Sequence, residues 1–188
     1  MTTTATMGLL LAAGRGTRFG PGNKLLADWG GVPVVVAAAT ALRRAVDGPW
    51  VAVIRDARVG ALLPGFRLLR MFGADEDMSA SLARGFVHAS EHGAERVLVA
   101  LGDMPAVPVT HLTRLMRSCT DSHPAASGHD ARPGVPACIP RRLFPIAMAV
   151  KGNIGARRLL AGHAPIILPL SAAARRDIDR PADLRPGR

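Results

Sequence analysis

Short apolar runs alternate with longer amphipathic stretches along most of this 188-residue chain. The short runs are rich in Val, Leu and Ile, as buried strands are, and the longer stretches repeat their apolar positions at helical spacing. This alternation predicts an α/β fold, in which helices flank an open and mostly parallel sheet. The predicted strands are Met7–Leu11, Trp50–Ile54, Leu68–Phe72, Val97–Leu101, Ala125–Ser127, Val135–Ile139 and Ile166–Leu168. The predicted helices are Val34–Val46, Ser79–Glu91, Val109–Ser118, Arg142–Val150 and Ile154–Leu160.

The length of the chain and the lack of internal repeats predict one domain over residues 1–188. Pro, Gly, His and Asp crowd together between residues 120 and 140, so we expect a loop or an edge hairpin there. The tail after about residue 184 is expected to be frayed.

A glycine-rich loop follows the first predicted strand and carries the strongest functional signal. Glycines let the backbone turn through positive φ and bring N–H groups close to a ligand. Successive free N–H groups form an anion-binding concavity, and nearby cations neutralise a polyphosphate. The loop therefore resembles a nucleotide-phosphate site in outline. Its glycines and cations are Gly14, Gly16, Gly20, Gly22, Arg15, Arg18 and Lys24.

The loop matches neither of the two commonest glycine motifs. A P-loop needs Ser or Thr after its lysine, but Leu25 follows Lys24. A dinucleotide fingerprint needs GxGxxG, and here the third glycine comes one residue late, at Gly20. An ordinary glycine-rich turn stays open on this evidence alone. The position of Lys24, one of only two lysines in the chain, favours phosphate binding.

Two aspartates follow predicted strands. Asp103 comes directly after the apolar run ending at Leu101, and Asp179 comes after the strand near Ile166–Leu168. Ligands of open α/β sheets collect beyond the carboxyl ends of the strands. Aspartate before proline is also a common turn residue. Beside a polyphosphate loop, however, the two carboxylates predict a Mg²⁺ site, because Mg²⁺ prefers one or two carboxylates together with substrate phosphates.

Composition narrows the class of protein. Hydrophobic residues make up 48% of the chain and mean hydropathy is +0.19, which excludes disorder. No apolar run reaches the roughly 20 residues of a membrane span, and the start lacks the basic region of a signal peptide. Cys119 and Cys138 lack metal-ligand spacing, so we expect buried thiols and a cytoplasmic location.

The net charge of +10 raises the possibility of a nucleic acid partner. The arginines are scattered in pairs, and aromatic residues make up only 4% of the chain, with no Tyr. Platforms on which bases could stack are therefore scarce. We expect a solvated arginine-rich surface that attracts an anionic small molecule, and no nucleic acid or membrane partner.

Several segments together resemble the MobA-like nucleotidyltransferases, and the molybdenum cofactor cytidylyltransferases in particular. The two specific segments, when paired, are LAAGRGTRFGPGNKLL and LGDMPAV; the weaker ones are DIDRPADL, DMSASLARG and GVPACIPRRLF…KGNIGARRLL. The resemblance implies a Rossmann-like fold of the nucleotide-diphospho-sugar transferase type. It also implies transfer of a nucleoside monophosphate from a nucleoside triphosphate to a phosphorylated pterin, the molybdenum cofactor, with release of pyrophosphate. A molybdenum hydroxylase or its chaperone would be the partner.

The resemblance assigns roles to individual residues. Arg15 and Lys24 would neutralise the triphosphate, and Asp103 and Asp179 would hold Mg²⁺. Relatives that use GTP commonly carry LAGG in the opening loop, so Ala13 favours CTP. The expected catalytic residues are Arg15, Lys24 and Asp103. The expected nucleotide-binding residues are Leu11, Ala12, Ala13, Gly14, Arg15, Gly16, Lys24, Ser79 and Ser81.

The chain departs from the family pattern at four positions. Asn23 stands where many relatives have an acid or glutamine, and Asp77 replaces a glycine near the expected base pocket. Val135 replaces a histidine and Asn153 an aspartate, both toward the acceptor side. The nucleotide half of the site is therefore better supported than the pterin half.

Two other functions remain open. One is an NAD(P)H-dependent oxidoreductase of the nicotine-blue-reducing type, a description attached to relatives of this family. The missing GxGxxG and the absence of a ribose-binding acid about 20 residues later argue against it. The other is a non-catalytic carrier of a nucleotide or cofactor. Binding alone does not require Lys24, Asp103 and Asp179 together, which argues against a carrier.

Overall fold

The structure of the chain is a computed structural model that describes residues 5–14, 16–73, 78–129, 132–149, 159–160 and 162–184. The strands are β1 (Thr6–Ala12), β2 (Asp28–Trp29), β3 (Val32–Pro33), β4 (Trp50–Ile54), β5 (Arg67–Arg70), β6 (Arg96–Leu101), β7 (Ala125–His129), β8 (Arg132–Pro140) and β9 (Ile166–Pro169). The helices are α1 (Val34–Ala45), α2 (Ala57–Ala61), α3 (Met78–Glu91), α4 (Val109–Ser118) and α5 (Phe144–Ala149). Short 3₁₀ turns cover η1 (Lys24–Leu26), η2 (Arg141–Leu143) and η3 (Pro181–Leu184).

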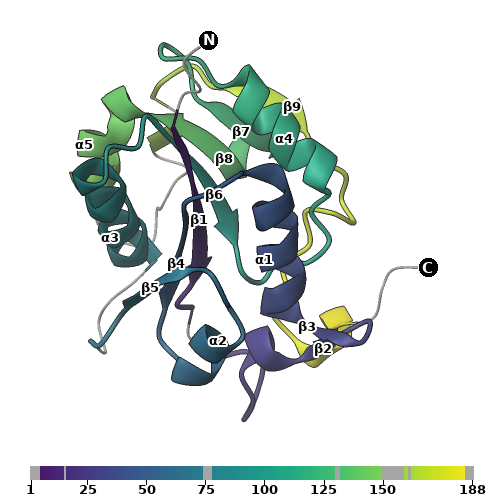
Figure 1. Cartoon of the computed structure of the whole chain (residues 1–188). Helices are drawn as coiled ribbons and strands as arrows, with labels where there is room; N and C mark the ends of the chain where they lie inside the picture. Colours follow the sequence, from purple (N-terminus) through teal and green to yellow (C-terminus); the bar gives the residue numbers. More distant parts are fainter. Residues whose placement is uncertain are drawn as a thin grey trace.

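Seven strands form one central sheet in the order β5-β4-β1-β6-β8-β7-β9 (Figure 1). The pairs β5–β4, β4–β1, β1–β6 and β7–β9 are parallel, and β8 runs antiparallel to both β6 and β7. The predicted α/β fold with a mostly parallel sheet is therefore confirmed. Strand β1 lies in the middle of the sheet, so the glycine-rich loop that follows it emerges between two buried neighbours.

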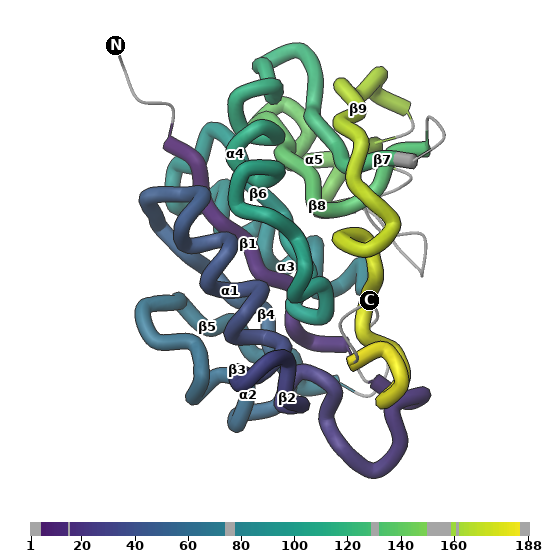
Figure 2. Tube along the Cα trace, turned by 90° about the vertical axis from the view of Figure 1, so that its right-hand side faces the viewer, coloured from purple at the N-terminus to yellow at the C-terminus, as the bar shows by residue number. Residues whose placement is uncertain are grey.

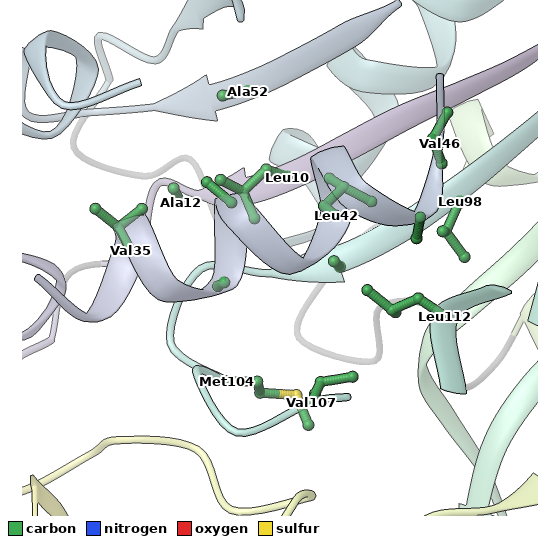
Figure 3. Packing of buried hydrophobic residues seen from close by; sticks show 14 of the residues in the cluster. Leu10, Ala12, Val35, Leu42, Val46, Ala52, Leu98, Met104, Val107 and Leu112 are labelled. Atoms are coloured by element: carbon green, nitrogen blue, oxygen red, sulfur yellow. The ribbon is translucent and has the colours of Figure 1, made fainter. Parts of the chain in front are cut away.

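Helices cover both faces of the sheet, with α1 and α4 on one face and α3 and α5 on the other (Figure 1). Alternate residues of β1 face the two sides: Leu10 packs with α1, while Leu9 and Leu11 pack with α3 and α5. In Figure 3 Leu10 and Leu98 lie on either side of Leu42 of α1. A strand buried on both faces reads as a continuous apolar run, which is why β1 was recognisable from sequence.

The hairpin predicted between residues 120 and 140 exists, but its predicted place at the edge of the sheet is wrong. β7 and β8 pair with each other, while β8 also pairs with β6 and β7 also pairs with β9. The outer strand is β9. The short parallel strand near Ile166 returns to cover the hairpin, a long-range pairing that the local composition of residues 120–140 does not show.

Several short elements were not expected, namely the β2–β3 ribbon, helix α2 and the three 3₁₀ turns. Most of the predicted helix Ile154–Leu160 and the tail from residue 185 lie outside the described residues. Cys119 and Cys138 are buried free thiols, as predicted. In the described part of the chain, no helix is both long and apolar enough to cross a membrane.

Candidate functional site

The glycine-rich loop leaves the carboxyl end of β1 at Ala12 and folds back on itself. Gly16 has φ +57° and Gly20 has φ +89°, values that favour glycine because a Cβ would strain the backbone. The N–H of Phe19 donates to the carbonyl of Gly16 at 2.9 Å, which closes a tight turn between them. The expected nucleotide residues Leu11, Ala12 and Ala13 are buried, whereas Gly14 is exposed. Arg15 lies outside the described residues.

The loop ends in a capped turn that fixes Lys24. The side chain of Asn23 accepts a hydrogen bond from the N–H of Leu25 at 3.0 Å, as an N-cap does. The same side chain donates to Asp56 Oδ2 at 3.0 Å, so it ties the loop to the residue that caps α2. Lys24 therefore enters η1 with its side chain directed inward, where it is only 8% exposed.

Lys24 brings the two predicted aspartates together. Its Nζ donates to Asp103 Oδ2 at 2.7 Å and to Asp179 Oδ1 at 3.0 Å. Asp179 also accepts a hydrogen bond from Arg18 Nη1, at 2.7 Å. Figure 2 shows the yellow C-terminal segment beside the purple loop that follows β1, so residues more than 150 positions apart meet here. We call Lys24, Asp103 and Asp179 together the Lys24 cluster.

Backbone hydrogen bonds hold the two aspartates in place. After β6, the N–H of Gly102 donates to the carbonyl of Leu11, and the carbonyl of Asp103 accepts from the N–H of Ile178, both at 2.9 Å. The carboxylate of Asp183 accepts from the N–H groups of Asp179 and Arg180 at 3.0 and 2.8 Å. The segment carrying Asp179 is thus pinned both to the end of β6 and to its own following turn.

Burial and charge act against each other in the Lys24 cluster. Burial lowers the pKa of Lys24, but attraction to Asp103 and hydrogen bonds to both aspartates outweigh it and raise the pKa above its ordinary value. Burial raises the pKa of Asp103, and Lys24 opposes that rise. The side chain of Asp103 is 21% exposed and that of Asp179 is 37% exposed. Both carboxylates therefore reach solvent, beyond the carboxyl ends of the central strands. The Lys24 cluster thus consists of a buried ammonium group hydrogen-bonded to two partly exposed carboxylates.

The donor set fits a divalent metal ion. Asp103 Oδ2 and Asp179 Oδ1 both accept a hydrogen bond from the Lys24 ammonium, so two carboxylate oxygens converge on one small cation. Hard carboxylate oxygens beside a phosphate-binding loop are what Mg²⁺ selects. The residues present can therefore hold such an ion if Lys24 turns toward the phosphates.

On the other side of the loop, Arg55 braces the residue expected to read the base. Its Nε donates to the carbonyl of Ala13 at 3.3 Å and its Nη1 donates to the carbonyl of Gly73. Ser79 and Ser81, in the first turn of α3, are both buried. Ala13 packs in the same core cluster as residues of the first turns of α3, so the residues expected to contact the base lie on one face of the sheet.

Two positions around the loop, Arg55 and Asp56, were not predicted as site residues, and Arg18 was predicted only as a cation of the loop and not as a partner of Asp179. Arg55 directly follows strand β4, but arginine is so common in this chain that it did not stand out. Asp56 follows strand β4 as Asp103 follows β6, and that shared position was a usable signal. Of the family departures, Val135 packs partly buried against the core on the α3 side, while Asp77 and Asn153 lie outside the described residues.

His111 on α4 is buried and hydrogen-bonded. Its Nε2 lies 2.8 Å from Ser127 Oγ, and Ser127 donates its hydroxyl proton to the carbonyl of Pro136 at 2.7 Å. Since that proton is committed, His111 Nε2 must be the donor to Ser127. The chain of hydrogen bonds joins α4 to β7 and β8.

We expect His111 to make the protein less stable in mild acid. Burial, helped by Arg114, lowers the pKa of His111 in the folded state, so the unfolded chain takes up its proton first, near pH 6.5. Stability is fully present above about pH 6.5 and is lost as pH falls through the lowered folded pKa. Urea unfolding at about pH 7.5 and 5.5 should show a smaller loss in His111→Gln, whose amide N–H can still donate to Ser127. An equal loss in both proteins would contradict this.

Comparison with known proteins adds a family and several relatives. Residues 8–166 match the family described as MobA-like NTP transferase domain. Nicotine blue oxidoreductase from Paenarthrobacter nicotinovorans is 31% identical over 167 residues, which cover 81% of this chain and 80% of that protein.

Solved structures share the fold over nearly the whole chain. Rv0371c from Mycobacterium tuberculosis H37Rv superposes with a TM-score of 0.85 at 23% identity, over 97% of this chain and 96% of that one. A complex of Rv0371c with manganese superposes with a TM-score of 0.72 at 22% identity, over 89% and 88%. A nucleotidyl transferase from Methanothermobacter thermautotroptrophicus has a TM-score of 0.81 at 25% identity, over 96% and 94%.

Proposed function

The chain belongs to the MobA-like NTP transferase family, and we propose that it transfers CMP from CTP to a phosphorylated pterin, the molybdenum cofactor, releasing pyrophosphate. The observation that carries the proposal is the Lys24 cluster at the end of the glycine-rich loop. A nucleotidyl transfer needs a cation for the departing pyrophosphate and carboxylates for a divalent ion, and the cluster supplies both residue types at one edge of the sheet.

In this reaction an oxygen of the acceptor phosphate attacks the α-phosphorus of CTP. The bond from that phosphorus to its bridging oxygen breaks, and pyrophosphate leaves with the electron pair. The acceptor is already an anion, so no protein nucleophile is required. The protein contributes position and charge: the loop N–H groups hold the phosphates, and Lys24, with Arg15, balances the charge that builds on pyrophosphate.

We propose Mg²⁺ as the metal, held by Asp103 and Asp179. Asp103 and Asp179 would hold the ion, which would offset negative charge on the triphosphate during the transfer. In the free protein Lys24 holds the two carboxylates in place and stops them from repelling each other. The manganese complex of Rv0371c, which shares this fold, supports a divalent ion in this architecture.

CTP is the proposed nucleotide because Ala13 stands where relatives that use GTP carry glycine. Ala13 is buried and its carbonyl accepts a hydrogen bond from Arg55 Nε, which fixes the backbone at the position where we propose that the base is read. We expect Ala13→Gly to lower the preference for CTP over GTP about tenfold, since one methyl group in a pocket discriminates by about that much. Initial rates with each nucleotide measure the preference. An unchanged ratio would remove Ala13 from the selection of the base.

The acceptor is the less supported half of the proposal. Val135 stands where relatives have histidine on the acceptor side, and it packs partly buried against the core and offers no hydrogen bond. A phosphorylated pterin remains the proposed acceptor, and a molybdenum hydroxylase or its chaperone the proposed recipient of the product.

Pyrophosphate release in the presence of Mg²⁺ tests the function directly. The molybdenum cofactor serves as acceptor, and CTP, GTP, ATP and UTP are compared in parallel. Release with CTP alone is the expected result. Binding of CTP without release would redirect the search to another acceptor or to a carrier. A failure to bind any nucleotide would refute the assignment of the glycine-rich loop.

The second candidate is an NAD(P)H-dependent oxidoreductase, favoured by the 31% identity to nicotine blue oxidoreductase. Hydride transfer does not require a lysine between two carboxylates, so an oxidoreductase activity does not account for the Lys24 cluster. Oxidation of NADH or NADPH by nicotine blue, followed by absorbance, distinguishes the two. Turnover there that is insensitive to Asp103→Asn, together with no pyrophosphate release, would favour the oxidoreductase.

A further inference from the structure

A second group of possible metal ligands lies on the last turn of α3, apart from the Lys24 cluster. Its members are His88, Glu91 and His92, and each offers a ligand atom within 4.8 Å of the other two. His88 is half-buried and the other two are exposed. The imidazole rings lie almost over one another, with centroids 3.9 Å apart and planes inclined by 33°. Positions four residues apart share one face of a helix, which brings the three side chains together.

One histidine of this group already has the proton arrangement of a metal ligand. His92 Nδ1 lies 2.9 Å from the carbonyl of His88, which can only accept, so Nδ1 carries the proton. The lone pair of His92 is then on Nε2, which is left to bind a cation. Histidine ligands of metals characteristically donate their other N–H to a carbonyl or carboxylate in this way, because the bond fixes both the tautomer and the ring orientation.

The backbone of the last turn is held firmly. The N–H of His92 donates to the carbonyl of His88 at 3.1 Å, and the N–H of Ala94 donates to that of Ala89 at 3.0 Å. Gly93, with φ +70°, ends the helix in the left-handed conformation. The ligand-bearing turn is therefore formed before any ion arrives, which reduces the ordering cost of binding.

We propose that His88, Glu91 and His92 bind one late first-row divalent cation, of the class of Zn²⁺, Ni²⁺ and Cu²⁺. Two imidazoles and one carboxylate suit these ions and not Mg²⁺, which demands oxygen ligands. Glu91 provides the negative charge that the imidazoles lack, on the surface of a chain whose net charge is +10. The bound ion would stabilise the C-terminal turn of α3.

This site is independent of the proposed function. His88, the first of the three ligands in the chain, follows Ser81 by seven positions, so it lies about 10 Å beyond Ser81 along the axis of α3. Loss of the ion should leave nucleotidyl transfer unchanged. Failure of the transferase proposal, in turn, says nothing about this site.

Calorimetric titration of the full-length chain with Zn²⁺ tests the proposal. Excess Mg²⁺ is present to occupy the carboxylates of Asp103 and Asp179, and the chain is first freed of metal by a chelator. We expect one Zn²⁺ per chain, with affinity reduced at least about tenfold in His88→Ala and in His92→Ala and reduced in Glu91→Gln. His123→Ala, which removes an exposed histidine from another part of the chain, is the matched control and should bind as the wild type does.

Thermal unfolding with and without Zn²⁺ supplies a readout that does not depend on heat of binding. The wild type and His123→Ala should gain stability from Zn²⁺, whereas His88→Ala and His92→Ala should gain none. Circular dichroism before titration establishes that the variants are folded. Equal Zn²⁺ affinity in the wild type and both histidine variants, or no binding in the wild type, overturns the proposal.

Discussion

Replacing Asp103 by asparagine is expected to reduce pyrophosphate release by about a thousandfold or more while leaving the fold intact. Asp103 lies at the end of β6 with its carboxylate toward Lys24 and Asp179, and asparagine keeps the shape but removes the charge. Removing one preorganised charged or polar group from such a site typically costs 10²–10³ in turnover, and here the proposed metal loses a ligand as well. The fold should survive because Lys24 keeps Asp179 as a partner.

The control for Asp103→Asn is the same substitution at an aspartate that lies away from the Lys24 cluster. Asp47 is exposed in the connection between α1 and β4, before the amino end of β4, whereas Asp103 follows the carboxyl end of β6. The variant Asp47→Asn should therefore turn over as the wild type does. Nucleotide affinity measured without metal should be largely spared in Asp103→Asn. Turnover of that variant at the wild-type rate would refute the role of Asp103 and, with it, the metal site.

Replacing Lys24 by methionine should lower both turnover and stability. Methionine has similar length, but it leaves Asp103 without its ion-pair partner and leaves Asp179 paired with Arg18 alone. Breaking a fully buried ion pair costs 3–5 kcal/mol; Asp179 is 37% exposed, so we expect a loss of about 2 kcal/mol in the free energy of unfolding. Turnover should fall by about 10²–10³, because the departing pyrophosphate loses its cation.

Two further variants separate stability from catalysis at this position. Lys24→Arg should recover part of the stability but not the turnover, since a planar guanidinium cannot replace a compact ammonium between two carboxylates. In an Asp103→Asn background, removing Lys24 should cost less stability than in the wild type, because position 103 then carries no charge to be left unpaired and Asp179 keeps Arg18. Urea unfolding gives both values. An equal cost in the two backgrounds would show that Lys24 and Asp103 are not coupled.

Much of the fold was predictable because the faces that an element buries determine which of its positions are apolar. The continuous apolar run of β1 and the helical spacing of α1 and α4 each follow from what they pack against. The two-residue strands β2 and β3 and the five-residue helix α2 were missed because segments so short carry no periodicity. The outer position of β9 was missed because parallel pairing joins distant segments without a local turn signal.

The residues of the candidate site were named from sequence, but their arrangement was not. The glycines, Lys24 and the two aspartates stood out because each follows a strand or a turn of recognisable chemistry. Arg55, which holds the carbonyl of Ala13, and Asn23, which caps η1 and bonds Asp56, were not assigned these contacts, because a side chain's partner depends on a neighbouring strand end.

The sequence by itself determined the alternation of strands and helices, the place of the glycine-rich loop after the first strand, and the kinds of side chain that lie near it. Only the tertiary structure decided that Asp179 lies against Lys24, 155 residues away, and that Arg18 shares it. Local composition governs which segments bury their apolar faces, whereas the meeting of distant charges depends on the order of the strands and on the return of the C-terminal segment along the sheet edge.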